Sequence, residues 1–174
     1  MHIRTLLQMR SLVIGAALAA LVIPLTASGG TSSTLDSTAQ RDADLYQIDQ
    51  IERNFHLATS TQNLPLMMSL WAPGAVFNID QQTLTGKAQI RHWFATQAGA
   101  FQPGHHWESD TPSYKLKASV NGDKATLYFE CHYIDPKTQM VVSYVAVTHQ
   151  LQKINGKWLI VDSAAKPAVL SAKP

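Results

Sequence analysis

Histidine is the side chain in this sequence best suited to acid–base chemistry, because its ordinary pKa lies close to neutral pH. Six histidines follow residue 27, and they are His56, His92, His105, His106, His132 and His149. No two of them have the four-residue helical spacing that is typical of a metal-binding pair, so we expect no bound metal. His105 and His106 are adjacent, and successive side chains of a strand point to opposite faces. Only one of these two can therefore face a pocket.

Two further candidates for proton transfer lie on predicted strands. His132 belongs to an alternating run in which Phe129 and Cys131 share the apolar face, and this pattern places His132 on the polar face. A β-bulge, or a pocket on the polar face, would be needed to bring it to a substrate. Asp80 ends a predicted strand, where a carboxylate is either a solvated turn residue or, with a raised pKa, a general base.

The remaining candidates could either line a pocket or fill a core. His149 shares a strand face with Val145 and Val147, which fits a hydrogen-bonded core histidine or a pocket-lining one. Cys131 fits a buried packing residue, because reactive thiols need an electropositive and partly exposed setting. Large aromatic side chains suit a pocket for flat rings and suit a core equally well. The aromatic candidates for the lining of a ligand pocket are Phe55, Trp71, Trp93, Trp107 and Phe129.

Three helices are predicted to position these residues. Residues 42–59 carry apolar side chains at spacings of three and four, which predicts one buried helical stripe of Leu45, Ile48, Ile51, Phe55 and Ala58. Glu52 and His56 lie four residues apart, which predicts a pair on the exposed surface of that helix. The alternative is that His56, which borders the apolar stripe, reaches the mouth of a pocket. A second helix is expected to begin at Asn63, and a third follows Gly86.

The rest of the chain predicts a sheet. Residues 75–79 and 83–85 flank a short turn, and after Pro103 apolar and polar residues alternate as in half-buried strands. Turns are expected at residues 121–123, 135–137 and 155–156, where asparagine, aspartate, proline and glycine gather. Helices followed by a meander indicate one α+β domain, with the helices packed on one face of an antiparallel sheet.

The N-terminus predicts a signal peptide over residues 1–27. Arg4 and Arg10 precede a 13-residue apolar run, and small residues follow it. The run is shorter than the roughly 20 residues of a membrane-spanning helix, so we expect no membrane span after cleavage. An uncleaved N-terminal anchor is the alternative interpretation. We therefore expect an exported protein, periplasmic or secreted.

Cleavage near residue 27 leaves a chain with 12 basic and 12 acidic side chains. This neutral balance lacks the basic face that nucleic-acid binding requires, so no nucleic-acid partner is expected. Residues 28–41 are rich in serine, threonine and glycine and predict a flexible linker. The folded domain is expected over residues 42–165, with a C-terminal tail over residues 166–174.

Four local motifs follow one another in the predicted domain: LWAPGAVF at residues 70–77, TGKAQIRHWF at 85–94, VNGDKA at 120–125 and NGKWLI at 155–160. In this order they resemble the SnoaL-like branch of the nuclear transport factor 2-like superfamily. The resemblance implies a cone-shaped, curved antiparallel sheet wrapped round about three N-terminal helices, with an apolar pocket and no cofactor. That superfamily includes polyketide cyclases, scytalone-type dehydratases, ketosteroid isomerases and binding domains without chemistry, so the fold does not settle function.

The resemblance also implies roles for particular residues. Scytalone-type dehydratases keep a catalytic histidine, followed by an aromatic residue, where the third helix meets the sheet, and His106 with Trp107 matches that pattern. A second dehydratase histidine lies within a few residues of His132, and the general base of ketosteroid isomerases lies near Asp80. The first helix departs from both enzymes, since the place of the isomerase's oxyanion tyrosine falls near Phe55 and the dehydratase's tyrosine and aspartate are absent.

Two functions are consistent with these residues. The first is a cofactor-free lyase or isomerase for a small cyclic or carbonyl compound, with His106 as the leading acid–base group and Asp80 or His132 as its partner. The second is a non-catalytic domain that binds an apolar or cyclic molecule or forms a homodimer, the dimer being implied by the resemblance alone. The enzyme hypothesis requires His106 to reach into an enclosed pocket, within about 3 Å of a second polar group or one bridging water.

Overall fold

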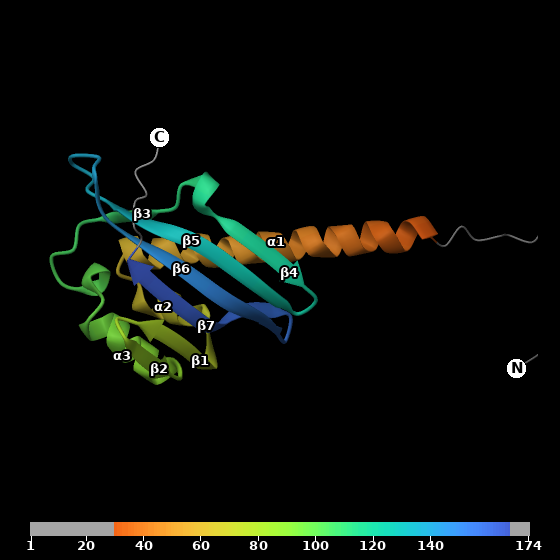
Figure 1. Ribbon diagram of the computed structural model, residues 1–174, viewed down its shortest axis with the longest axis horizontal. Coiled ribbons are helices and arrows are strands. Elements are labelled where there is room, and N and C mark those ends of the chain that lie inside the picture. The colour runs from red at the N-terminus through yellow and green to blue at the C-terminus, as the bar shows by residue number, and fades with distance from the viewer. Residues whose placement is uncertain (1–29, 168–174) are drawn as a thin grey trace, which may run out of the picture.

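A computed structural model describes residues 30–167 of the chain (Figure 1). The predicted signal peptide, residues 1–27, and residues 168–174 of the predicted tail lie outside the described residues. Between residues 30 and 167, no helix is both long enough and apolar enough to cross a membrane.

The three predicted helices are confirmed as α1 (Gly30–Ser60), α2 (Leu64–Ser69) and α3 (Lys87–Thr96). The Asn63 side chain caps α2 by accepting a hydrogen bond from the backbone N–H of Leu66 at 2.9 Å. The predicted linker is wrong for residues 30–41, which are the first turns of α1. No glycine or proline interrupts residues 31–41, so the helix continues through them and projects beyond the sheet (Figure 1).

The sheet has seven strands. Their bounds are β1 (Trp71–Ile79), β2 (Gln82–Thr85), β3 (Glu108–Asp110), β4 (Lys117–Asn121), β5 (Lys124–Ile134), β6 (Val141–Ile154) and β7 (Lys157–Pro167). The strand order is β2-β1-β7-β6-β5-β3, and β4 also pairs with β5. Two short 3₁₀ helices, η1 (Gly99–Phe101) and η2 (Ser113–Lys115), lie in the connections around β3.

Two predictions about the sheet need correction. β1 pairs with β7 in parallel, so the sheet is mixed and not antiparallel throughout. This pairing joins strands from the two ends of the domain, and no local turn signals its direction. β7 also continues to Pro167, which pairs with Val145 of β6, so the first two residues of the predicted tail belong to the sheet.

Register irregularities bend the long strands. One lies between Gln150 and Leu151 where β6 meets β7, and another lies between Tyr133 and Ile134 where β5 meets β6. Such bulges increase local bending and twist, which gives the sheet a concave face. Figure 1 shows α1 running across one face of this sheet, with α2 and α3 gathered near β1 and β2.

A buried carboxylate ties α1 to the far end of the sheet. Asp44 Oδ1 accepts hydrogen bonds from Lys153 Nζ at 2.6 Å and from Trp158 Nε1 at 3.0 Å. Burial opposes ionisation of Asp44, but the hydrogen bonds from Lys153, Trp158 and Gln40 outweigh it and hold the pKa of the carboxyl below its ordinary value. Asp44 is therefore a charged anchor, which fixes the helix along its own axis.

Aromatic rings fill the space between α1 and the sheet, and His149 lies among them. Its ring centre is 5.4 Å from that of Phe55 and 5.3 Å from that of Phe129. Its Nδ1 lies 2.9 Å from Ser163 Oγ, and Nε2 has no hydrogen-bond partner among residues 30–167. Burial lowers the pKa of His149 to about 3, so the imidazole is neutral near pH 7.

His149 should make the fold sensitive to mild acid. The pKa of His149 is lower in the folded protein than in the unfolded chain. Below about pH 6.5 the imidazole is therefore protonated in the unfolded chain but stays unprotonated in the folded protein. Stability is therefore complete above that pH and declines as the pH falls toward 3. Urea unfolding should show that wild type loses about 2 kcal/mol more than His149→Gln between about pH 7 and pH 5.

The matched control for this experiment is His92→Gln, because His92 is exposed on α3. It should follow the pH dependence of wild type. Equal pH dependence in wild type and His149→Gln would contradict a neutral buried His149.

Candidate functional site

A cavity of about 280 Å³ lies between α1, α3 and the concave face of the sheet. Side chains from α1, β1, α3, η1, β5, β6 and β7 form its wall. Its aromatic lining consists of Phe55, Phe77, Trp93, Phe94, Phe101, Trp107 and Tyr133. Two of these rings, Phe77 and Phe94, stack at an interplanar angle of 9°, and Trp93 meets Phe77 edge-on at 88°. The cavity is therefore suited to a flat, apolar group.

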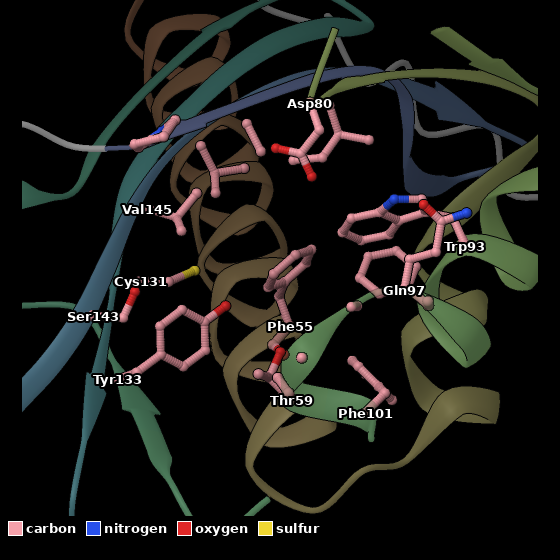
Figure 2. Close-up of a pocket in the computed structure, with 18 of the residues that line it drawn as sticks. Phe55, Thr59, Asp80, Trp93, Gln97, Phe101, Cys131, Tyr133, Ser143 and Val145 are labelled. Carbon is pink, nitrogen blue, oxygen red and sulfur yellow. The ribbon is translucent and has the colours of Figure 1, made fainter. Parts of the chain in front are cut away.

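Several polar side chains line this aromatic cavity, and the ones with acid–base chemistry lie on β5 and in the β1–β2 turn. In Figure 2 the Tyr133 hydroxyl and the Cys131 sulfur, both on β5, point toward the centre of the cavity beside Phe55. The carboxylate of Asp80 points in from another side. Asp80 lies in the β1–β2 turn with a left-handed φ of 49°, and it is the one carboxylate among the described lining residues. Asp80 is exposed, so it marks the mouth of the cavity.

Burial keeps the two polar groups of β5 protonated. It raises the pKa of the Cys131 thiol, and the nearby charge of Glu52 raises it further. Burial also raises the pKa of the Tyr133 phenol. At neutral pH the inner wall therefore offers a thiol and a phenol, and Asp80 is the acidic group at the mouth.

His106 does not reach the cavity, so the predicted catalytic role fails its own geometric requirement. Its side chain is 60% exposed, its Nδ1 lies 3.2 Å from the Gly104 carbonyl oxygen, and its Nε2 lies 3.8 Å from Asp135. The chain is still a loop at this point, so the alternation expected of a strand does not apply. The adjacent His105 is the more buried of the two, and its pKa is lowered chiefly by burial.

His132 lies on the face of β5 opposite Cys131 and Tyr133, so it does not reach the cavity either. Its Nε2 is 3.3 Å from Glu130 Oε2, and the other oxygen of Glu130 accepts hydrogen bonds from Lys115 at 3.0 Å and Tyr128 at 2.8 Å. Burial opposes ionisation of Glu130, but these hydrogen bonds prevail and lower the pKa of its carboxyl. The predicted catalytic partner therefore belongs to a separate polar cluster on the outer face.

Of the six residues predicted to line a ligand pocket, three line the cavity and three lie in the core. Phe55, Trp93 and Trp107 line the cavity. Trp71, Phe129 and His149 lie behind that lining as part of the core, with 1%, 0% and 0% of their surface exposed. Trp93 is 8% exposed, and its Nε1 has no hydrogen-bond partner among the described residues. An unpartnered buried donor is uncommon in folded proteins.

A second concavity lies on the other side of α1, and sequence reasoning missed its polar centre. The Glu52–His56 pair, predicted to be on the surface, is buried at 6% and 5% exposure. Glu52 Oε1 lies 3.1 Å from His56 Nε2, and Ser109 Oγ lies 2.7 Å from His56 Nδ1. The four-residue spacing identified the pair, but only the docking of β3 beside α1 buries it and adds Ser109. Glu52, His56 and Ser109 all line this concavity.

Comparison with known proteins gives a family match over nearly the whole folded domain. The model of the SnoaL-like domain family matches residues 40–163. Comparison with curated proteins gives no significant match.

Solved structures share the fold at low sequence identity. An NTF2-like protein with a cystatin-like fold from Novosphingobium aromaticivorans has a TM-score of 0.68 and 15% identity, over 80% of this chain and 92% of that one. A hexachlorocyclohexane dehydrochlorinase, LinA-type3 from Novosphingobium barchaimii, has a TM-score of 0.63 and 12% identity, over 78% of this chain and 96% of that one. A protein of unknown function from Nostoc punctiforme has a TM-score of 0.63 and 17% identity, over 76% of this chain and 95% of that one. These likenesses show an NTF2-like fold.

Cys131 should resist thiol reagents in the native protein although it lines the cavity. Its side chain is 1% exposed, and each unit by which the pKa of the thiol rises lowers the reactive thiolate fraction tenfold. Labelling with Ellman's reagent should be at least about 100-fold slower in the native protein than in guanidinium. A Ser119→Cys, Cys131→Ser variant, with its cysteine exposed on β4, should label quickly without denaturant. Fast labelling of native wild type would contradict the buried, protonated thiol.

Proposed function

Because this chain belongs to the SnoaL-like domain family, we propose that its cavity binds a small, flat, largely apolar molecule built on a ring. The observation that carries this proposal is the aromatic cavity of about 280 Å³ between α1, α3 and the sheet. A cavity of roughly 150 Å³ lined by apolar side chains holds benzene. The cavity therefore has room for a substituted ring or two fused rings.

The lining indicates what else the ligand carries. Aromatic walls favour a ring, because each square ångström of apolar surface removed from water contributes about 25 cal/mol. The Trp93 Nε1–H is a buried donor without a partner among residues 30–167, so a ligand with a hydrogen-bond acceptor would satisfy it. The Tyr133 hydroxyl and the Asp80 carboxylate offer further polar contacts. A ring bearing a carbonyl or hydroxyl group fits this set of contacts.

A second candidate function, acid–base catalysis in the same cavity, is favoured by the placement of Asp80 and Tyr133. Their polar groups enter the cavity from different sides, as Figure 2 shows. Asp80 would take a proton from the carbon next to a carbonyl, while a hydroxyl such as that of Tyr133 would donate a hydrogen bond to the enolate oxygen. Return of the proton to another carbon is an isomerisation, and loss of a leaving group from the neighbouring carbon is an elimination.

The N-terminal sequence supports a proposal about the compartment in which the protein acts. We propose that residues 1–27 direct export and that the domain acts in the periplasm or outside the cell, on the strength of the basic start, the 13-residue apolar run and the small residues after it.

Blocking the cavity should abolish ligand binding. We choose 4-nitrophenol as the probe, because it is a flat ring that carries hydrogen-bond acceptors and an acidic hydroxyl, and its binding can be followed by quenching of tryptophan fluorescence. Val145→Trp places a large ring in the cavity and should weaken binding at least about tenfold. Val142→Trp is the matched control on the same strand, because Val142 is exposed and does not line the cavity. Equal binding by both variants would contradict the proposed site.

Catalysis predicts a separate result with a ketone. Wild type should accelerate deuterium exchange next to the carbonyl of 1-indanone in heavy water, measured by NMR. Asp80→Asn should lower that rate at least about 100-fold while leaving indanone binding intact, since general-base catalysis is typically worth that much. Asp123→Asn, in the exposed β4–β5 hairpin, is the control. Binding without accelerated exchange in wild type would leave ligand binding as the function and exclude Asp80 catalysis for this class of ketone.

A further inference from the structure

The second concavity, on the other side of α1 from the aromatic cavity, contains side chains suited to covalent catalysis. Ser109 of β3 and the α1 residues His56 and Glu52 line it, and all three are buried. A serine hydroxyl next to a histidine that is itself next to a carboxylate is the arrangement that activates serine as a nucleophile. The proposed function of the aromatic cavity uses none of these groups.

The contacts within this set are of hydrogen-bond length. Ser109 Oγ lies 2.7 Å from His56 Nδ1, and His56 Nε2 lies 3.1 Å from Glu52 Oε1. Glu52 and His56 are about one helical turn apart, so α1 itself holds the carboxylate against the imidazole. Ser109 is held beside them by β3, which pairs with β5 through the partners Ser109 and Tyr133. The nucleophile is therefore fixed by the sheet, and the base and its carboxylate are fixed by the helix.

Two neighbours of His56 Nε2 place the imidazole proton on that nitrogen. A carboxylate only accepts hydrogen bonds, so the contact with Glu52 Oε1 requires an Nε2–H. The Thr111 hydroxyl donates to the Glu130 carbonyl oxygen at 2.9 Å, so at 2.6 Å from His56 Nε2 it can only accept. In the neutral imidazole, Nδ1 is then an acceptor, and the Ser109 hydroxyl donates to it. This is the tautomer that a general base for Ser109 needs.

A further hydroxyl lies beside the nucleophile. Ser60 Oγ, at the end of α1, accepts a hydrogen bond from the backbone N–H of Ser109 at 2.8 Å, and Ser60 also lines the concavity. The Ser60 hydroxyl makes no other hydrogen bond to a group among residues 30–167, so its own proton is free. It can donate to the oxygen that becomes negative when Ser109 adds to a carbonyl carbon.

The charges of the second concavity bear on its substrate. Four acidic side chains line it, and they are Asp49, Glu52, Glu108 and Asp110. Its one lining arginine, Arg53, is in an ion pair with Asp49 at 2.7 Å. The local field is therefore negative, which disfavours an anionic substrate and favours a neutral or cationic one.

We propose that Ser109, His56 and Glu52 form a second active site, which transfers the acyl group of a small ester to Ser109 and then to water. Its substrate class is a neutral or cationic ester. The apolar lining of the concavity, which accommodates the alkyl or aryl part of the ester, consists of Leu57, Leu116 and Ile134. This activity does not depend on the ligand proposed for the aromatic cavity.

The reaction conserves atoms and charge. Ser109 Oγ forms a bond to the carbonyl carbon of the ester, and its proton moves to His56 Nδ1. The bond from that carbon to the leaving oxygen breaks, and His56 gives the proton to the leaving alcohol. Water then attacks the acyl-serine, gives one proton to His56 Nδ1 and adds its hydroxyl to the acyl group, and His56 returns that proton to the Ser109 oxygen. The products are a carboxylic acid and an alcohol.

The test uses the full chain with 4-nitrophenyl acetate, whose hydrolysis releases coloured 4-nitrophenolate. Wild type should release it faster than buffer does, with a rate that saturates as the ester concentration rises. Ser109→Ala should reduce the rate to that of buffer, and His56→Gln should lower kcat at least about 100-fold. Ser119→Ala, at an exposed position of β4, is the matched control and should keep the wild-type rate. Wild-type hydrolysis by Ser109→Ala would overturn the proposal.

Covalent trapping gives a second readout that needs no variant, so it holds even if Ser109→Ala does not fold. Phenylmethylsulfonyl fluoride should sulfonylate native wild type with loss of fluoride, and tandem mass spectrometry should locate the adduct on Ser109. The protein unfolded in guanidinium should not react there, because Ser109 then lacks its base. Absence of an adduct on native Ser109 would overturn the second active site, while the binding of 4-nitrophenol in the aromatic cavity would stand or fall by its own test.

Glu52 acts through His56 and is a positioning residue, so its effect should be confined to the chemical step. Glu52→Gln keeps the size of the side chain and removes its charge. It should lower kcat at least about tenfold and leave KM within about twofold of wild type. A rise in KM with kcat unchanged would contradict this role.

The substrate class is tested with two aryl acetates of similar size and opposite charge, 4-acetoxyphenyltrimethylammonium and 4-acetoxybenzoate. The acceleration over buffer should be larger for the cation, and about 0.5 M sodium chloride should reduce the difference. A preference for the anion would overturn the proposed substrate class.

Discussion

The structure depends on the burial of one apolar stripe of α1 against the concave face of the sheet. Ile48, Ile51, Phe55 and Ala58 form that stripe and are at most 6% exposed. Because successive residues of a helix are turned by about 100°, fixing this stripe also fixes the directions of its neighbours. Phe55 and Thr59 then face the aromatic cavity, whereas Glu52 and His56 face the second concavity. The Asp44 anchor prevents the helix from sliding along its axis, so both sites stay in register with β5.

Some buried ionisable groups of this fold are charged and others are neutral, and the hydrogen bonds that each group accepts decide between the two states. Asp44 and Glu130 remain charged because side-chain N–H and O–H groups donate hydrogen bonds to the two carboxylates. His149, with only Ser163 beside one nitrogen, stays neutral among aromatic rings. Burial likewise keeps the Cys131 thiol and the Tyr133 phenol in their neutral, protonated forms. The inner part of the aromatic cavity is therefore uncharged, which favours an apolar ligand and concentrates its acid–base character at Asp80.

The family and the fold limit the chemistry without deciding it. The same NTF2-like architecture is found in a dehydrochlorinase and in proteins of unknown function. The curved sheet and its helices supply a pocket, and the polar side chains that reach the pocket determine what happens in it. In this chain the polar side chains that reach the pocket include Cys131 and Tyr133 of β5, Asp80 of the β1–β2 turn and Thr59 of α1. The histidines of the loop before β3 and of the outer face of β5 do not contribute.

The sequence by itself determined the elements and the family. The helical period of residues 42–59 and the alternation along β5 are local patterns, and local patterns set secondary structure and the buried face of each element. The motifs at residues 70–77, 85–94, 120–125 and 155–160 appear in the order of a SnoaL-like domain, and the match over residues 40–163 confirms it.

Only the tertiary structure decided which polar residues meet. His106 lies in a loop, where side-chain direction follows no period, so neither spacing nor resemblance could place it. The parallel pairing of β1 with β7 and the docking of β3 beside α1 join segments far apart in the chain. The burial of Glu52 and His56, and their contact with Ser109, depend on that long-range packing. A four-residue spacing makes two side chains neighbours on a helix, but the element that covers them determines whether they are surface or site.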